Sequence, residues 1–206
     1  MTAQDKILYV ANKLGLTSLK DMQASTGAVY DADAENSGQI FSSASRHQNP
    51  GLTNLTQNEF EVNEALLVET IAFYMTSTEE GSPTIFNLQE VYGSEAVIVF
   101  DLRIGNKTVM KQTPVFGAGS NYTFGTQGIR NTAVTPALAG KSSILPRHQV
   151  YLEGAGILIP PQVQFSIEYR LFNVVTGAII PFREPFEHIA CYLFGTRVLL
   201  NFNTSI

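Results

Sequence analysis

The stretch Gln162-Val-Gln-Phe-Ser-Ile-Glu-Tyr-Arg-Leu171 alternates between polar and apolar side chains without a break. A period of two residues predicts a β-strand with one face in a core and the other toward water. Pro160 and Pro161, just before it, lack backbone N–H donors, so we expect strand pairing to begin after them or at an edge. The polar face mixes amides, a hydroxyl and both charges, which we interpret as a solvated scaffold without chemistry of its own.

The composition fits one β domain whose surface is largely covered. The chain has 206 residues, of which 44% are hydrophobic and only 15% are charged. This length supports one sizeable core. Sparse charge suggests that copies of the chain cover part of the surface, and a well-packed monomer is the alternative. The formal net charge of −5 argues against direct contact with nucleic acid.

The charges are unevenly distributed. Residues 61–100 contain seven glutamates and no Lys or Arg, whereas residues 101–206 contain nine basic and five acidic residues. These two regions are complementary within one molecule or between neighbours in an assembly, and the sequence does not choose between the two.

Nothing in the sequence indicates an enzyme, a cofactor or a metal site. The single cysteine, Cys191, excludes an intramolecular disulfide, and the histidines His47, His148 and His188 are widely spaced. The glycines between Gly117 and Gly128 lack the Lys-Ser/Thr ending of a phosphate-binding loop. The first residues lack a signal-peptide pattern, and no apolar run is long enough to span a membrane, so we expect synthesis in a cytoplasm.

The first 60 residues read as an N-terminal arm, separate from a sandwich at residues 61–206. Apolar spacing predicts a helix over residues 2–14, capped by Thr2 and stopped by Gly15, and a second short helix over Ser18–Ala24. Two short helices also suggest a DNA-binding helix-turn-helix, but the second lacks a basic cluster. Residues 25–60 show no periodicity, so we expect an extended tether that docks at intervals.

The rest of the chain reads as strands, about eight in total. Seven of them have definite bounds: Ala65–Met75, Ala96–Ile104, Lys107–Thr113, Gln149–Glu153, Gln162–Leu171, Ala178–Ile180 and Ile189–Asn201, the last one broken or bulged at Gly195. Gly105-Asn106 predicts a tight hairpin between the second and third of these. Loops of unequal length favour an all-β, antiparallel sandwich with Greek-key crossings.

An alternating strand begins after two prolines in the segment Ile157-Leu-Ile-Pro-Pro-Gln-Val-Gln-Phe-Ser-Ile-Glu-Tyr169. The chain also has a helical and extended arm and long loops. In these features it resembles jelly-roll capsid proteins of tailless icosahedral viruses, bacteriophages in particular. The resemblance covers residues 60–206 as a pattern. It implies a single jelly-roll-like β-sandwich, because a double jelly roll needs a longer chain. It also implies a viral structural protein found in the virion, whose partners are copies of itself and other virion proteins.

The leading hypothesis is therefore a capsid protein that self-assembles through the sides of its sandwich and through its arm. The docking anchors of the arm would be Ile7, Leu8, Leu14, Tyr30, Phe41 and Leu55, and the alternative for each is packing onto its own sandwich. The second hypothesis is a recognition module, such as a virion spike or carbohydrate-binding domain, with its site in loops Thr76–Pro83 and Gly117–Gly128. Closeness to a membrane stays open.

Overall fold

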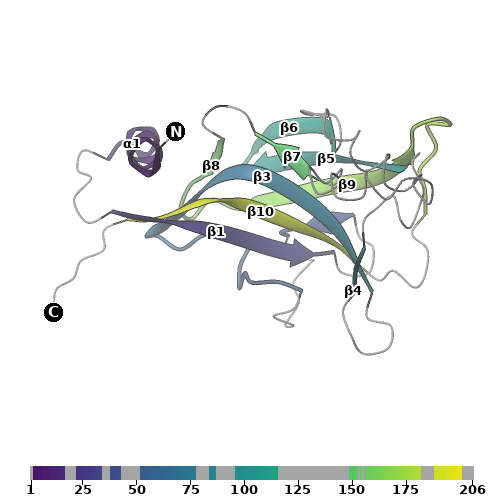
Figure 1. Ribbon diagram of the computed structural model, residues 1–206, viewed down its shortest axis with the longest axis horizontal. Coiled ribbons are helices and arrows are strands. Elements are labelled where there is room, and N and C mark those ends of the chain that lie inside the picture. The colour runs from purple at the N-terminus through teal and green to yellow at the C-terminus, as the bar shows by residue number, and fades with distance from the viewer. Residues whose placement is uncertain are drawn as a thin grey trace, which may run out of the picture.

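The described part of the chain folds into two antiparallel β-sheets packed face to face and one short helix (Figure 1). The computed structural model describes residues 2–16, 22–33, 38–42, 52–77, 84–86, 96–115, 149–152, 154, 156–181 and 188–200. The expectation of an all-β, antiparallel sandwich is confirmed. Over the described residues we find no helix with the length and apolarity needed to cross a membrane.

The first sheet, sheet A, has the order β1-β10-β3, with three short strands along the far edge of β3. Its long strands are β1 (Gln23–Ala32), β3 (Glu64–Ser77) and β10 (His188–Leu199). The short strands are β4 (Thr84–Phe86), β7 (Gln149–Tyr151) and β8 (Ile157–Ile159), which pair with successive parts of β3. One edge of this sheet is thus assembled from three separate pieces of chain.

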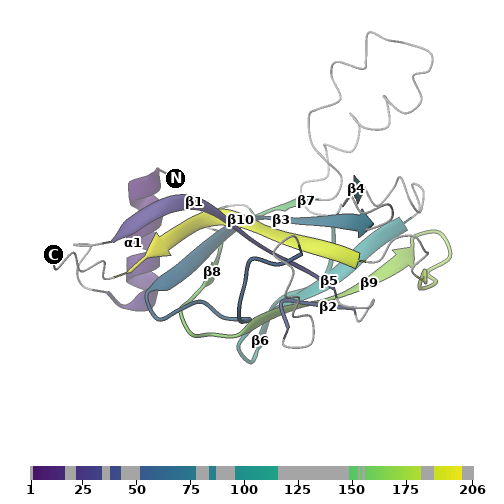
Figure 2. The same ribbon diagram turned by 90° about the horizontal axis from the view of Figure 1, so that it is seen from below.

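The second sheet, sheet B, has the order β2-β9-β5-β6. Its strands are β2 (Gln39–Ile40), β5 (Ala96–Ile104), β6 (Lys107–Pro114) and β9 (Phe165–Asn173). Figure 2 shows β1, β10 and β3 as one layer above β2, β9 and β6. The hairpin at Gly105-Asn106 is confirmed, and Gly105 adopts the positive φ of 56° that such a tight turn requires.

The strand pairings are nested from the ends of the chain inward. The first strand pairs with the last (β1 with β10), β2 pairs with β9, β3 pairs with β7 and β8, and β5 pairs with β6. The chain therefore winds as one long hairpin whose two arms alternate between the sheets. The short β4 is an addition to this plan.

One apolar core fills the space between the sheets. The apolar positions of β9 that the sequence predicted, Phe165, Ile167, Tyr169 and Leu171, all lie in it. They face side chains of β3, β5 and β10, including Phe73 and Phe100, whose rings pack 5.1 Å apart. The strand begins at Phe165, whereas the alternating sequence begins three residues earlier, at Gln162. The chain first forms a bridge between Pro161 and Phe60, and it pairs with β5 only from Phe165 onward.

A β-bulge in β3 changes which of its residues face the core. Phe194 pairs with Thr70 and Gly195 pairs with Val68, so Glu69 is the extra residue. The break that was predicted at Gly195 lies at this point, although the inserted residue belongs to the neighbouring strand. Before the bulge, Leu66 and Val68 face the core while Ala65 and Leu67 face outward into a second apolar cluster.

Helix α1 (Ala3–Leu14) covers that second cluster. Thr2 and Asp5 form a capping box, and hydrogen bonds from the Thr2 backbone and side chain lower the pKa of the Asp5 carboxyl. Gly15 ends the helix with a φ of 69°, as predicted. Val10 is buried against Leu67 and Val198, so α1 closes the outer face of sheet A at the end where β1 begins (Figure 1).

The predicted extended arm is replaced by strands over the described residues between 22 and 60. Gln23–Ala32, which includes the end of the predicted second helix, pairs with β10 along its whole length. Gln39–Ile40 pairs with β9, and Ile40, Phe41 and Phe60 are core residues. A strand with few strand-forming side chains is stable here because β10 supplies its hydrogen bonds. Of the remaining predictions, Ala178–Ile180 is a single bridge at Ile179 instead of a strand.

Candidate functional site

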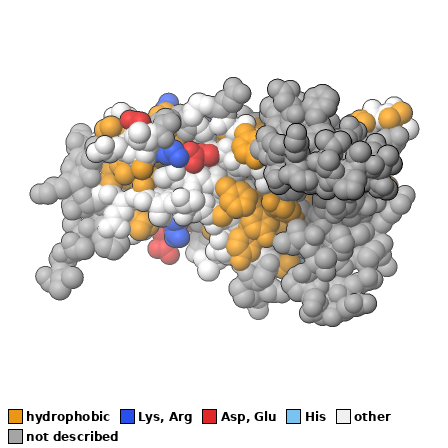
Figure 3. Space-filling view, in the orientation of Figure 1, with side chains coloured by type: hydrophobic (Ala, Val, Ile, Leu, Met, Phe, Trp, Pro, Cys, Tyr) orange, Lys and Arg blue, Asp and Glu red, His pale blue; other side chains and the backbone are white. Residues whose placement is uncertain are grey.

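An aromatic surface lies on the outer face of sheet A, beyond the part that α1 covers. We define the aromatic face by Tyr30, Tyr74, Tyr192 and Phe194. Pairing in β1·β10 sets Tyr30 beside Tyr192, and pairing in β10·β3 sets Ala72 beside Tyr192 and Tyr74 beside Ala190. The small neighbours leave the rings standing above the sheet, and Figure 3 shows hydrophobic side chains gathered over the middle of this face.

Tyr192 is the centre of this surface. Its ring stacks on Tyr30 at 5.1 Å and on Phe194 at 5.7 Å, and it meets Tyr74 edge-on at 5.2 Å. Such contacts fix the rings in one arrangement. Partial burial, and then the neighbouring hydroxyls of Tyr30 and Tyr74, raise the pKa of Tyr192.

Polar contacts extend this surface toward the edge of the sheet. The Tyr151 hydroxyl donates a 2.6 Å hydrogen bond to the Gln149 side chain, whose amide lies 3.4 Å from the Tyr74 hydroxyl. On the side of this surface toward α1, Lys6 and Glu69 form an ion pair of 2.5 Å. The surface is thus apolar at its centre and polar at its rim, as in protein–protein interfaces.

A second apolar surface lies on the turn after β9. We define the apolar tip by Val174, Val175 and Ile179, which are 52%, 72% and 65% exposed. The turn is well ordered because the Asn173 side chain accepts hydrogen bonds from the backbone N–H groups of Val175 and Thr176. Large apolar side chains held in the solvent by an ordered turn indicate a contact surface.

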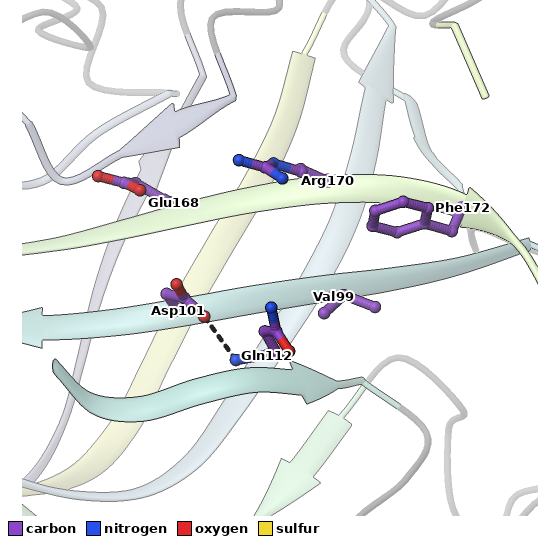
Figure 4. Close-up of a pocket in the computed structure, with 6 residues that line it drawn as sticks. All are labelled: Val99, Asp101, Gln112, Glu168, Arg170 and Phe172. Carbon is purple, nitrogen blue, oxygen red and sulfur yellow. Dashed lines mark hydrogen bonds between the residues drawn. The ribbon is translucent and has the colours of Figure 1, made fainter. Parts of the chain in front are cut away.

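A groove of about 400 Å³ crosses the outer face of sheet B. We define the sheet B groove by its described lining residues, which are Val99, Asp101, Gln112, Glu168, Arg170 and Phe172. Figure 4 shows Glu168, Arg170 and Phe172 in a row along β9, with Asp101 and Val99 on the neighbouring β5. The sequence interpretation of this polar face as scaffold did not anticipate the groove, because its walls come from three strands.

A bulge between β5 and β6 shapes this groove. Phe100 pairs with Thr113 and Leu102 pairs with Met110, so two residues of β6 lie opposite Asp101. One of them, Gln112, has a φ of 47°, and its backbone N–H donates a hydrogen bond to the Asp101 carboxylate (Figure 4). A non-glycine residue in this left-handed region is strained, and strained residues cluster at functional sites.

The buried acids Asp31 and Asp33 are structural. The Asp31 carboxylate accepts a 2.7 Å hydrogen bond from the Phe41 backbone, and the Asp33 carboxylate accepts bonds from Gly38 and from the Tyr169 hydroxyl. They join the end of β1 to the start of β2, where the chain crosses between the sheets. Burial, and then Asp31, raise the pKa of the Cys191 thiol well above its usual range.

The predicted anchors make contacts within their own chain. Phe41 is a core residue, Leu55 packs at the edge of that core, and Leu14 packs in the cluster under α1. Tyr30 belongs to the aromatic face and is partly buried by Tyr192. Ile7 is partly buried on α1 and Leu8 is 43% exposed. Their role in assembly stays a prediction, and only Tyr30 lies on a surface that we select from the structure.

The described residues contain no group of three or more side chains suited to a metal ion. His188 contacts the backbone oxygen of Asp33 at 2.7 Å, while Cys191 lies in the core. The loop Gly117–Gly128, and most of Thr76–Pro83, lie outside the described residues, as do His47 and His148. No protein-family model, curated protein or solved structure matches this chain.

Proposed function

We propose that this chain is a structural subunit of a virus particle, a capsid protein that assembles with copies of itself. The observation that carries the proposal is the presence of two separate apolar contact surfaces, the aromatic face on sheet A and the apolar tip after β9 in sheet B. In this proposal the protein is made in the cytoplasm of a host such as a bacterium and is found in the virion. Its partners are itself and other virion proteins.

A second copy of the chain is the partner that best fits the aromatic face. The face is rich in tyrosine and has no charged side chain among its defining residues. Tyrosine is enriched at interface centres, and charge is depleted there. An uncharged face that is its own chemical complement favours association between identical subunits.

The apolar tip is a second contact surface, which a subunit needs in order to form a shell larger than a dimer. One self-complementary surface closes into a pair, whereas growth beyond a pair needs a second, separate surface on each subunit. Val175 lies in the turn after β9 of sheet B, whereas Tyr192 lies on β10 of sheet A, so contacts through one leave the other available.

The winding of the chain supports the jelly-roll part of the proposal. A jelly roll has eight strands in two sheets, wound so that the first pairs with the last and each inner pair follows in turn. The nested pairings of β1 with β10, β2 with β9, β3 with β7 and β8, and β5 with β6 correspond to that plan. Viral capsid domains, lectins and cupins use this fold, so the fold alone does not select the function.

Sedimentation of matched variants tests the two-surface assembly. We expect the purified chain to form large particles, Tyr192→Ser to remove contacts at the aromatic face, and Val175→Ser to remove those at the tip. Each single variant should stop at a small oligomer, and the double variant should be a monomer. Val62→Ser changes an apolar side chain that is 67% exposed outside both surfaces, so it should sediment like the unaltered chain. Variants that all sediment alike would contradict the proposal.

A further inference from the structure

We propose that the sheet B groove binds a neutral, hydroxyl-rich ligand of the pyranose class. This inference does not rest on the proposed assembly: the groove lies on the opposite sheet from the aromatic face, and it adjoins the apolar tip only where Phe172 pairs with Ile179. It also differs from the loop site that the sequence suggested for a carbohydrate-binding module. Five observations on the groove carry it.

The charges of the groove favour a neutral ligand. Asp101 and Glu168 are direct partners across β5 and β9, and two arginines on the same face balance them. Arg103 binds Glu168 at 3.0 Å, and Arg170 lines the groove. The charged residues of the described lining are Asp101, Glu168 and Arg170, and the ion pair with Arg103 offsets the charge of Glu168, so the lining presents no strong net charge to an ion.

The polar groups of the groove match hydroxyl groups. A hydroxyl both donates and accepts, so it can donate to a carboxylate and accept from a guanidinium at the same time. Asp101 already accepts the Gln112 backbone N–H through one oxygen, which fixes its orientation and leaves its second oxygen for a ligand. Arg170 lines the groove, and among the described residues no carboxylate lies within 4.0 Å of its guanidinium.

Phe172 and Val99 supply the apolar side of the groove. Figure 4 shows the Phe172 ring at one end of the row along β9, next to Arg170. A pyranose has one face of C–H groups and a rim of hydroxyls, so it can lie on an aromatic ring while its rim meets polar side chains. A groove of about 400 Å³ is within the size range of small-ligand sites.

The rigidity of the site supports the same conclusion. The residues come from β5, β6 and β9, and strands place side chains more firmly than loops do. The bulge at Gln112 brings its side chain to the groove, and the Asp101 hydrogen bond compensates part of the strain of its φ of 47°. The groove is thus formed before any ligand arrives.

Saturation-transfer NMR on the full chain tests this inference with four probes: the methyl glycosides of glucose, galactose, mannose and N-acetylglucosamine. We expect at least one to bind, and acetate and methylammonium to show no binding. Arg170→Gln and Asp101→Asn should each weaken the binding roughly tenfold or more, because each removes a charged hydrogen-bonding partner. Asn at position 101 keeps an oxygen for the Gln112 N–H, so the bulge and the thermal unfolding temperature should be preserved.

Lys107→Gln is the matched control, because Lys107 is exposed on the same sheet and outside the groove lining. It should bind the glycoside as the unaltered chain does. The inference is overturned if none of the four glycosides binds to the folded chain, or if binding by Arg170→Gln equals binding by Lys107→Gln.

Discussion

Gly156 and Gly195 approach the same two residues of β3 from its two sides. A Cβ at Gly195 would lie 1.9 Å from the Leu67 carbonyl oxygen, and a Cβ at Gly156 would lie 2.3 Å from that of Val68. Both contacts occur beside the bulge, where β3 passes from packing on both faces to packing mainly on the core side. The sequence predicted an irregularity at Gly195, but not that β3 carries the extra residue, because the extra residue is visible only in the pairing.

Gly156→Ala should destabilise the chain more than Gly154→Ala. The two glycines have φ angles of 77° and 78°, so alanine meets the same backbone strain at both positions. Only Gly156 lies against another strand, while nothing lies within 4 Å of a Cβ at Gly154. We expect Gly156→Ala to lose roughly 1–3 kcal/mol more free energy of unfolding than its control. Urea unfolding measures both, and equal losses would contradict the packing described at the bulge.

The Cys191 thiol should lower stability in alkaline solution. Burial raises its pKa in the folded chain, whereas the unfolded chain ionises near the ordinary value of 9.0. The folded state then holds more protons than the unfolded state, so the free energy of unfolding falls as the pH rises above 9.0. The slope from this group approaches about 1.4 kcal/mol per pH unit.

Urea unfolding of the chain and of Cys191→Ala between pH 7 and pH 10 checks this slope. Alanine cannot ionise, so the difference in stability between the two proteins should be constant up to about pH 9 and then shrink. The tyrosines are the same in both proteins, so their contribution cancels in the difference between the two. A difference that stays constant to pH 10 would show that the thiol is not buried as described.

At the scale of the element, the sequence predicted the long strands whose residues alternate or form apolar runs. It did not predict strands that lack such a pattern. The strands β3, β5, β6 and β9 have apolar runs or alternation, and their predictions are confirmed within a few residues. The residues of β1, Gln23–Ala32, include a glycine, three alanines and few strand-forming side chains, so local preference gave no signal. That strand depends on β10, which is far away in the sequence and therefore invisible to a local pattern.

Helix α1 also packs on the folded sandwich, because its residue Val10 is buried with Leu67 and Val198. Deleting residues 1–60 would remove β1 and β2, so it would unfold the sandwich and would not test an arm. A substitution in α1 is the more informative experiment. Val10→Ala should cost roughly 1–3 kcal/mol of unfolding free energy, because Val10 is fully buried against Leu67 and Val198.

Leu8→Ala is the control on the same helix. Leu8 is 43% exposed, and alanine and leucine have similar helix preference, so the loss should be within about 0.5 kcal/mol. Thermal or urea unfolding of both variants distinguishes the two faces of the helix. Equal losses at the two positions would mean that α1 is not packed on sheet A.

At the scale of the whole molecule, the proposed sites arise where residues from distant parts of the chain meet. Tyr30, Tyr74 and Tyr192 come from β1, β3 and β10, and no local pattern connects them. The groove similarly joins β5, β6 and β9. The sequence indicated a covered surface from its sparse charge and predicted contacts through the sandwich sides and the arm. It named anchor residues only in residues 1–60, because a local pattern does not show which strands pair.

The mass of the purified chain in solution tests the central claim, self-association into a shell. Light scattering over a concentration series should give a mass many times that of the 22.5 kDa chain. The mass should rise with concentration to a plateau, as expected for closed assembly through two apolar surfaces. A constant mass of 22.5 kDa at every concentration would contradict the account.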